Sequence, residues 1–213
     1  MMAFGGETAE WSDLFPDGLI PEVLKAILKC WDLVPRQLPN EHEVPITRRL
    51  REELRKEKNC RRLPFTVWPE SSETDPITGK EVGRIDLRFL HGHREEVYLA
   101  FECKRLRIRG SGGGIQSNTS DYVGEDGMMR HLSGKYSSGL KDSGMIGYVM
   151  DGKVSEAKQA IRQALVKGAQ RLWLLSGTGL EPSSCLAMDL RLAETQHECP
   201  DRLLRMHHVF LAV

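Results

Sequence analysis

Residues 82–105 read VGRIDLRFLHGHREEVYLAFECKR, and this stretch decides the fold that the sequence predicts. Apolar and polar residues alternate in 82–90 and again in 97–105, which is the period of a β-strand. The connection between these two runs is short, polar and contains glycine, so we expect an antiparallel hairpin. In this hairpin Asp86 lies opposite the neighbourhood of Glu102, while Glu102 and Lys104 project from one face. Two carboxylates and one ammonium group therefore converge.

This convergence suits metal-assisted hydrolysis of a phosphodiester. Two carboxylates can hold a hard cation such as Mg²⁺, which polarises the phosphate and acidifies a bound water. Lys104 can orient that water and stabilise the negative charge that builds up on phosphorus oxygens. A second E-x-K sequence, Glu156 to Lys158, lies in a helical pattern, where positions i and i+2 do not share a face. The alternative interpretation of Asp86, Glu102 and Lys104 is a salt-bridged patch on a solvent-facing ribbon.

The residues around the hairpin predict an α/β sandwich with a mixed sheet. Helices are indicated by a proline at the expected first residue and by apolar residues spaced three and four positions apart. Strands are indicated by short runs of β-branched or aromatic residues. We expect helices at 21–31, 45–58, 126–136 and 153–169, strands at 65–68, 82–90, 97–105, 145–150, 172–175 and 209–213, a polar turn region at 71–80, and a flexible loop at 110–121.

Charge is balanced overall but unevenly distributed. The chain has 213 residues with 30 Lys and Arg against 30 Asp and Glu. Residues 1–45 carry eight acids against three bases, and residues 46–62 carry eight bases against three acids. A basic stripe of this kind suits phosphate binding, although a solvated helix face with Glu–Arg pairs is the alternative. We therefore expect an acidic helical extension at 1–40, a confined basic cleft, and a domain at 41–213 that carries the predicted phosphodiester-hydrolysing site.

The composition also narrows the class of protein and the cellular compartment that we expect. No run of 18 apolar residues is present, so we expect no membrane span, and residues 1–10 lack the features of a secretory signal. Five widely spaced cysteines without a C-x-x-C pair argue against a disulfide framework or a zinc knuckle. We therefore expect reduced thiols in a cytoplasmic protein.

The segments Gly83-Arg84-Ile85-Asp86 and Phe101-Glu102-Cys103-Lys104 together resemble the PD-(D/E)xK nuclease superfamily. The resemblance spans residues 41–152 and implies the restriction-endonuclease-like fold, with an αβββαβ core. It implies that Asp86 and Glu102 are metal ligands, that Lys104 is the catalytic lysine, and that Mg²⁺, with Mn²⁺ as a substitute, is the cofactor. Ile85 stands where the family pattern has proline. Such families often add an acid from the preceding helix, for which we prefer Glu43, with Glu52 or Glu53 as alternatives.

Residues 122–136 and 144–149 are similar to uncharacterised bacterial members of the same superfamily that are associated with restriction or phage defence. We prefer an endonuclease to an exonuclease and DNA to RNA as the substrate, with RNA as the open alternative. The resemblance also implies a second copy or a partner protein in a larger complex. A non-catalytic nucleic-acid-binding or structural subunit is the alternative. For Arg130 and Tyr136, anchoring of their loop to the sheet is the alternative to phosphate contact. The residues expected to contact nucleic acid are Arg48, Arg84, Arg105, Arg107, Arg130, Lys135 and Tyr136.

Overall fold

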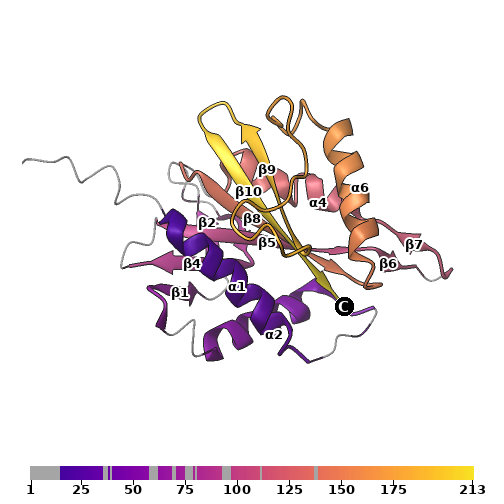
Figure 1. Ribbon diagram of the computed structural model, residues 1–213, viewed down its shortest axis with the longest axis horizontal. Helices are drawn as coiled ribbons and strands as arrows, with labels where there is room; N and C mark the ends of the chain where they lie inside the picture. The colour runs from indigo at the N-terminus through magenta and orange to yellow at the C-terminus, as the bar shows by residue number, and fades with distance from the viewer. Residues whose placement is uncertain are drawn as a thin grey trace, which may run out of the picture.

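The computed structural model describes residues 15–213, apart from gaps at 36–37, 39, 58–61, 69–70, 75–78, 80, 93–96, 111 and 137–138. Its centre is a mixed six-stranded sheet flanked by helices, as the sequence predicts at this level of detail (Figure 1). The helices are α1 (Ile20–Trp31), α2 (Glu43–Lys56), α4 (Thr119–Val123), α5 (Met128–Leu132) and α6 (Val154–Lys167), with a 3₁₀ turn at Asp17–Leu19.

The order of strands across the sheet is β1-β4-β5-β8-β10-β9. The three strands β5, β8 and β10 run parallel, and the outer pairs are antiparallel. The strand bounds are Phe65–Trp68 for β1, Leu87–His91 for β4, Tyr98–Leu106 for β5, Asp142–Val149 for β8, Leu192–Glu198 for β9 and Leu203–Ala212 for β10.

Both faces of the sheet are covered, and the buried hydrophobic side chains of the described residues form two large cores and a smaller third one that includes Tyr136. On β5, Leu99 and Phe101 face the core formed with α1 and α2, whereas Leu106 belongs to the core formed with α4, α5 and α6. Helix α1 is buried along one side in the first core. The described part of the predicted 1–40 extension is thus a layer of the same domain, and residues 1–14 lie outside the described residues. No helix among the described residues has the length and apolar character needed to cross a bilayer.

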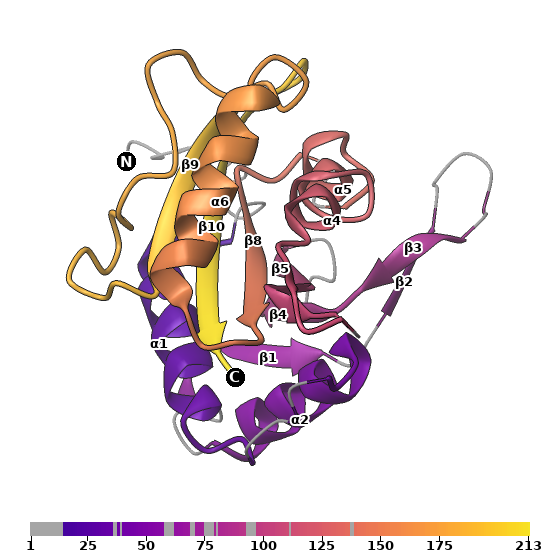
Figure 2. The same cartoon turned by 90° about the vertical axis from the view of Figure 1, so that its right-hand side faces the viewer.

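The predicted strand at 82–90 is wrong in one respect, because it is interrupted at Asp86. Its first half, β3 (Glu81–Ile85), pairs with β2 (Ser71–Thr74) in a separate two-stranded ribbon that projects from the body (Figure 2). Its second half is β4, which pairs with β5 from Leu87 opposite Phe101 onward. The predicted turn region at 71–80 therefore contains a strand. This strand, β2, pairs with β3 outside the core, and its sequence is polar. An alternation of apolar and polar residues therefore does not indicate it.

Three other expectations also need correction, and one strand of the sheet is not among those expected. The loop at 110–121 contains β7 (Ile115–Gln116), which pairs with β6 (Ile108–Arg109), and α4 begins before the loop ends. Where a helix is expected at 126–136, the structure has only the shorter helix α5 (Met128–Leu132). The strand expected at 172–175 is a single bridge between Leu174 and His197. The sequence does not predict β9, because its residues, LAETQHE, are mostly polar.

Candidate active site

Asp86 occupies the bend between β3 and β4, and its side chain completes the interrupted ladder. Its Oδ2 accepts a hydrogen bond of 2.8 Å from the backbone N–H of Cys103 on β5. In a continuous strand this N–H would bond to a backbone carbonyl of the neighbouring strand. Here the Asp86 carboxylate accepts it instead, which holds Asp86 beside Glu102 and Lys104. The break in the strand is therefore what brings the acid to its place.

Glu102 lies on β5 and is 2% exposed. Its Oε1 receives Lys104 Nζ at 2.7 Å and lies 3.4 Å from Arg130 Nη1, whereas its buried Oε2 has no hydrogen-bond partner among the described residues. Burial and the nearby charge of Asp86 raise the pKa of Glu102 to about 8, against the opposing effect of Lys104 and Arg130. The ionised carboxylate is therefore costly here unless a further cation compensates it.

Lys104 is held between two carboxylates from different elements. Besides Glu102, its Nζ lies 3.5 Å from Oε1 of Glu43, the first residue of α2. Burial opposes its charge, but Glu102, Glu43 and Asp86 outweigh this effect and raise the pKa of Lys104 above its usual range. Lys104 is therefore a cation at neutral pH, which suits charge stabilisation and excludes it as a proton acceptor.

Glu43 is the helix acid that the structure brings to the site. Its Oε2 accepts the backbone N–H of Arg105 at 3.0 Å, and burial raises its pKa. Glu52 is exposed on the same helix, and Glu53 pairs with Lys56 at 3.0 Å. Of the three candidate acids on α2, only Glu43 contacts Lys104.

The donor set of the site fits a hard divalent cation with few protein ligands. Among the described residues, no three Asp, Glu, His or Cys side chains group closely enough to hold a metal ion. Mg²⁺ usually takes one or two carboxylates and completes its shell with water and phosphate oxygens. The carboxylates of Asp86 and Glu102, with the unpaired Oε2 of Glu102, match that requirement. Glu43 as a third ligand stays a prediction, because its contacts here are to Lys104 and Arg105.

Arg130 of α5 and Tyr136 of the loop after α5 form a latch that contacts Glu102 and the end of β3. Arg130 Nη1 donates to the hydroxyl of Tyr136 at 2.6 Å, and that hydroxyl donates to the backbone carbonyl of Arg84 at 2.7 Å. A Cβ on Gly83 would collide with the Tyr136 hydroxyl oxygen. Glycine at this position therefore leaves room for the latch. The sequence offers no signal for that role, since the contact joins residues more than 50 positions apart.

The residues expected to contact nucleic acid fall into two groups. Arg48 on α2, Arg84 on β3 and Lys135 after α5 are exposed. The others are engaged within the protein or buried. Arg105 donates to the Glu41 carbonyl, Arg107 pairs with Asp151 and Glu156, Arg130 pairs with Glu102 and Asp126, and Tyr136 is 1% exposed. The burial of Tyr136 favours the anchoring role over phosphate contact.

A second buried polar cluster lies on β9 and β10, and we call it the histidine relay (Tyr122, Thr195, His197 and His208). His197 Nδ1 lies 2.7 Å from the Leu172 carbonyl, so Nδ1 carries the proton and Nε2 accepts from Thr195 at 2.7 Å. Thr195 in turn accepts from His208 Nε2 at 2.9 Å, and His208 Nδ1 accepts from Tyr122 at 2.9 Å. Every ring nitrogen of the relay is satisfied.

His207 and His208 are neighbours on β10, and only His208 belongs to the relay. Alternation along the strand predicts that only one of these two histidines faces the core. The structure buries both, at 1% and 0% exposure, because both faces of β10 are covered. His207 Nε2 instead contacts Asp142 Oδ1 at 3.1 Å.

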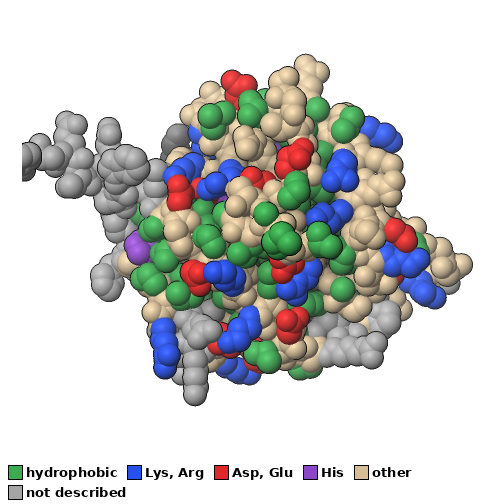
Figure 3. All heavy atoms as spheres, viewed as in Figure 1, with side chains coloured by type: hydrophobic (Ala, Val, Ile, Leu, Met, Phe, Trp, Pro, Cys, Tyr) green, Lys and Arg blue, Asp and Glu red, His purple; other side chains and the backbone are tan. Residues whose placement is uncertain are grey.

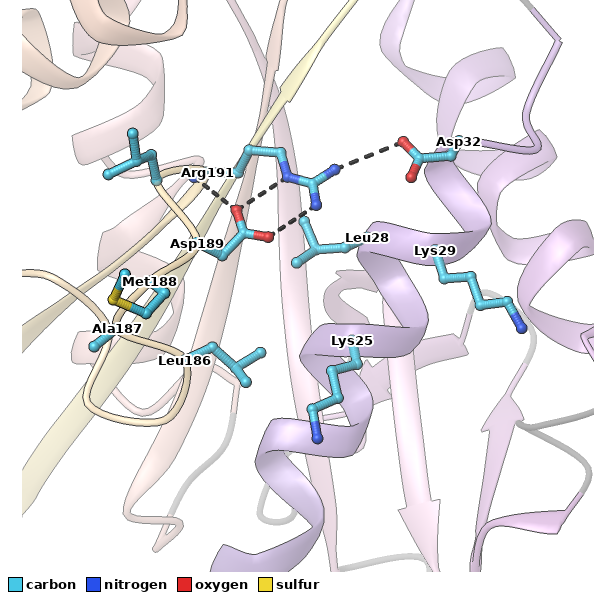
Figure 4. Close-up of a pocket in the computed structure, with 10 residues that line it drawn as sticks. Lys25, Leu28, Lys29, Asp32, Leu186, Ala187, Met188, Asp189 and Arg191 are labelled. Carbon is cyan, nitrogen blue, oxygen red and sulfur yellow. Dashed lines mark hydrogen bonds and ion pairs between the residues drawn. The ribbon is translucent and has the colours of Figure 1, made fainter.

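A large cavity lies elsewhere, between α1 and the segment 186–191. It has a volume of about 770 Å³ and includes none of the predicted site residues. Figure 4 shows Arg191 at its edge, bonded to Asp189 and pointing toward Asp32 at 3.6 Å. Met188 and Leu190 are 94% and 82% exposed. On this face, hydrophobic side chains alternate with charges of both signs (Figure 3). Its chemistry is that of an open surface hollow rather than of a catalytic centre.

Comparison with known proteins yields no relative for this fold and site. No protein-family model matches the chain, and no curated protein and no solved structure shows significant similarity to it.

Proposed function

We propose that the protein is a metal-dependent nuclease that hydrolyses phosphodiester bonds of DNA through Asp86, Glu102 and Lys104. The observation that carries the proposal is the convergence of these side chains at the interrupted strand, with Oε2 of Glu102 buried and unpaired among the described residues. A salt-bridged surface patch, the competing interpretation, does not explain why Glu102 is only 2% exposed. Clusters of buried ionisable groups with shifted pKa values are typical of catalytic sites.

The topology supports a restriction-endonuclease-like core. From α2 onward the chain runs helix, three antiparallel strands of the main sheet (β1, β4 and β5), the helices α4 and α5, and then β8, which lies parallel to β5. This is the αβββαβ order that the resemblance to PD-(D/E)xK nucleases implies. The strands β10 and β9 extend the sheet beyond β8, and the β2–β3 ribbon is an insertion before the first acid.

Each side chain has a separate task in the proposed reaction. Asp86 and Glu102 would hold a divalent cation, which supplies a more acidic bound water and a polarised phosphate. Lys104 stays protonated and donates to a phosphate oxygen as negative charge develops. Glu43 keeps the ammonium group of Lys104 over the site, and Arg130 holds Oε1 of Glu102 so that Oε2 stays available.

Cleavage of supercoiled plasmid tests the proposal. The purified protein should nick or linearise the plasmid in Mg²⁺ or Mn²⁺ and should be inactive in EDTA. Asp86→Asn should abolish cutting, whereas Glu52→Gln, at an exposed acid on α2, should cut at the wild-type rate. Wild-type cutting in EDTA would falsify the mechanism. A protein that binds DNA with a steep salt dependence but never cuts it would instead be the non-catalytic binding subunit.

A further inference from the structure

The strand that carries Glu102 and Lys104 continues into a small β-ribbon, which consists of β6 (Ile108–Arg109) and β7 (Ile115–Gln116). Between β5 and the ribbon lies Arg107, a non-glycine residue with a φ of 57°. Its guanidinium binds both Asp151 oxygens, with Nη2 at 2.8 Å from Oδ2, and also pairs with Glu156 of α6. These ion pairs hold the bend, so the direction of the ribbon is fixed relative to the candidate site.

The ribbon leaves the body and ends in a bare glycine turn. Figure 1 shows β6 and β7 extending past α6. The turn closes through Gly110 N–H to the Gly114 carbonyl at 2.8 Å, and a Cβ added at Gly112 would meet nothing within 4 Å. Nothing among the described residues therefore packs on the tip, and the glycines allow another molecule to approach the backbone closely.

One face of the ribbon presents a cation and an apolar side chain to solvent. Arg109 pairs across the ribbon with Ile115, so the two side chains share a face. Both are exposed, Ile115 at 41%. Arg109 makes no hydrogen bond or ion pair with another described residue, in contrast to Arg107. The opposite face holds Ile108, which packs on the main core.

These features match the major groove of B-form DNA. That groove is about 12 Å wide and 8.5 Å deep and admits a two-stranded ribbon. The two strands lie about 5 Å apart and have two residues each, so at about 3.3 Å per residue they reach roughly 7 Å into that depth, and the glycine turn extends beyond them. An arginine can bind guanine there, and an aliphatic side chain can contact the thymine methyl. The deep, narrow major groove of A-form RNA excludes such a ribbon.

We propose that the β6–β7 ribbon inserts into the major groove of duplex DNA next to the bond to be cleaved, which makes B-form duplex the substrate class. The inference rests on the proposed function, because it takes the candidate site as the point of cleavage. The groove contact itself requires only that Arg109, Ile115 and the glycine tip face the bases.

Binding of a fluorescent DNA duplex of about 20 base pairs in EDTA tests the inference without cleavage, because such a duplex spans about two helical turns. Arg109→Glu and Gly112→Glu should each weaken binding at least about tenfold. Arg171→Glu, the same charge reversal at an exposed position after α6, should change affinity less than about twofold. Wild-type protein should protect guanine N7 from methylation, and Arg109→Glu should lose that protection. An RNA duplex of the same sequence should bind at least about tenfold more weakly.

Unchanged DNA affinity in both ribbon variants, or equal binding of the RNA duplex, overturns the inference. Hydrolysis of bis(p-nitrophenyl) phosphate in Mn²⁺ separates this failure from failure of the proposed function, because that small ester reaches the site without a groove contact. Ribbon variants should hydrolyse it within about twofold of wild type. If wild type hydrolyses neither ester nor DNA, but ribbon variants still lose duplex binding, the nuclease proposal fails and the groove assignment stands.

Discussion

The candidate site and the histidine relay lie on opposite sides of β8, and both are buried polar groups in the same sheet. In the relay, a carbonyl acceptor at one end sets the direction of every hydrogen bond, and no ring nitrogen is left over. In the candidate site, Glu43 and Glu102 share Lys104, Arg130 also approaches Glu102, and Oε2 of Glu102 has no partner among the described residues. The relay thus pairs all of its ring nitrogens, whereas the site leaves one carboxylate oxygen without a partner among the described residues.

We attribute this difference to a structural role of the relay and to the proposed ligand-binding role of the site. A buried polar atom without a partner costs about 1–3 kcal/mol, a cost that the relay avoids at its ring nitrogens and that the site carries at Oε2 of Glu102. Burial and the nearby charge of Asp86 also raise the pKa of Glu102 to about 8. Such a cost is understandable if a ligand supplies the missing charge. Substitutions should therefore affect activity in one region and stability in the other.

The largest expected effect is the loss of cleavage in Lys104→Met. Removing a charge that stabilises the transition state typically lowers a rate about 10²–10³-fold, and the variant should still fold. Plasmid cleavage under single-turnover conditions measures this change. Lys56→Met, at an exposed lysine of α2, is the matched control and should cleave as wild type does. A Lys104→Met protein with undiminished cleavage would remove Lys104 from the mechanism.

The next effect is the loss of stability in Thr195→Val. This change removes the hydroxyl that joins the two relay histidines, leaving a buried acceptor and a buried donor unpaired, and should cost about 2–3 kcal/mol of unfolding free energy. Urea denaturation measures that cost. Thr66→Val on the exposed face of β1 is the control. Folded Thr195→Val should cleave normally, and a stability equal to wild type would contradict the structural role of the relay.

The contributions of the two regions to stability should also change with pH in opposite directions. Burial lowers the pKa of His197 to about 4, so between about 6.5 and 4 the unfolded chain binds more protons and stability falls as pH falls. The pKa of Glu102 is raised to about 8, so its contribution falls as pH rises from about 4.5 toward 8. Denaturation of wild type, His197→Gln and Glu102→Gln across this range of pH isolates each contribution. Parallel curves for all three proteins would contradict both assignments.

The smallest effect is expected from Gly83→Ala. The new methyl group would collide with the Tyr136 hydroxyl and displace the latch. Arg130 would then hold Glu102 less firmly, and cleavage should fall several-fold with a loss of about 1 kcal/mol in stability. Gly18→Ala, where an added Cβ meets nothing within 4 Å, is the control. Equal behaviour of the two alanine variants would show that the latch does not position Glu102.

The sequence predicts the part of the site that depends on local pattern. Alternation in 97–105 places Glu102 and Lys104 on one face, and the spacing to Asp86 follows from the hairpin. The break at Asp86 is not predictable, because 84–88 alternates as in an unbroken strand. The sequence offers anchoring to the sheet as one interpretation of Arg130 and Tyr136, but it does not indicate the contact with Arg84 or the relay from Tyr122, because these contacts join distant segments.

Glu102→Gln tests the central claim most directly, because the same sample reports on stability and on activity. The amide introduced by this substitution has the shape of the native carboxylate without its buried charge, so the free energy of unfolding near pH 8, the pKa of Glu102, should equal or exceed that of wild type. Plasmid cleavage in Mg²⁺ by that sample should be at least about 100-fold slower. Cleavage at the wild-type rate, or a destabilisation as large as that of Thr195→Val with no specific loss of activity, would contradict the assignment of this carboxylate cluster as the active site.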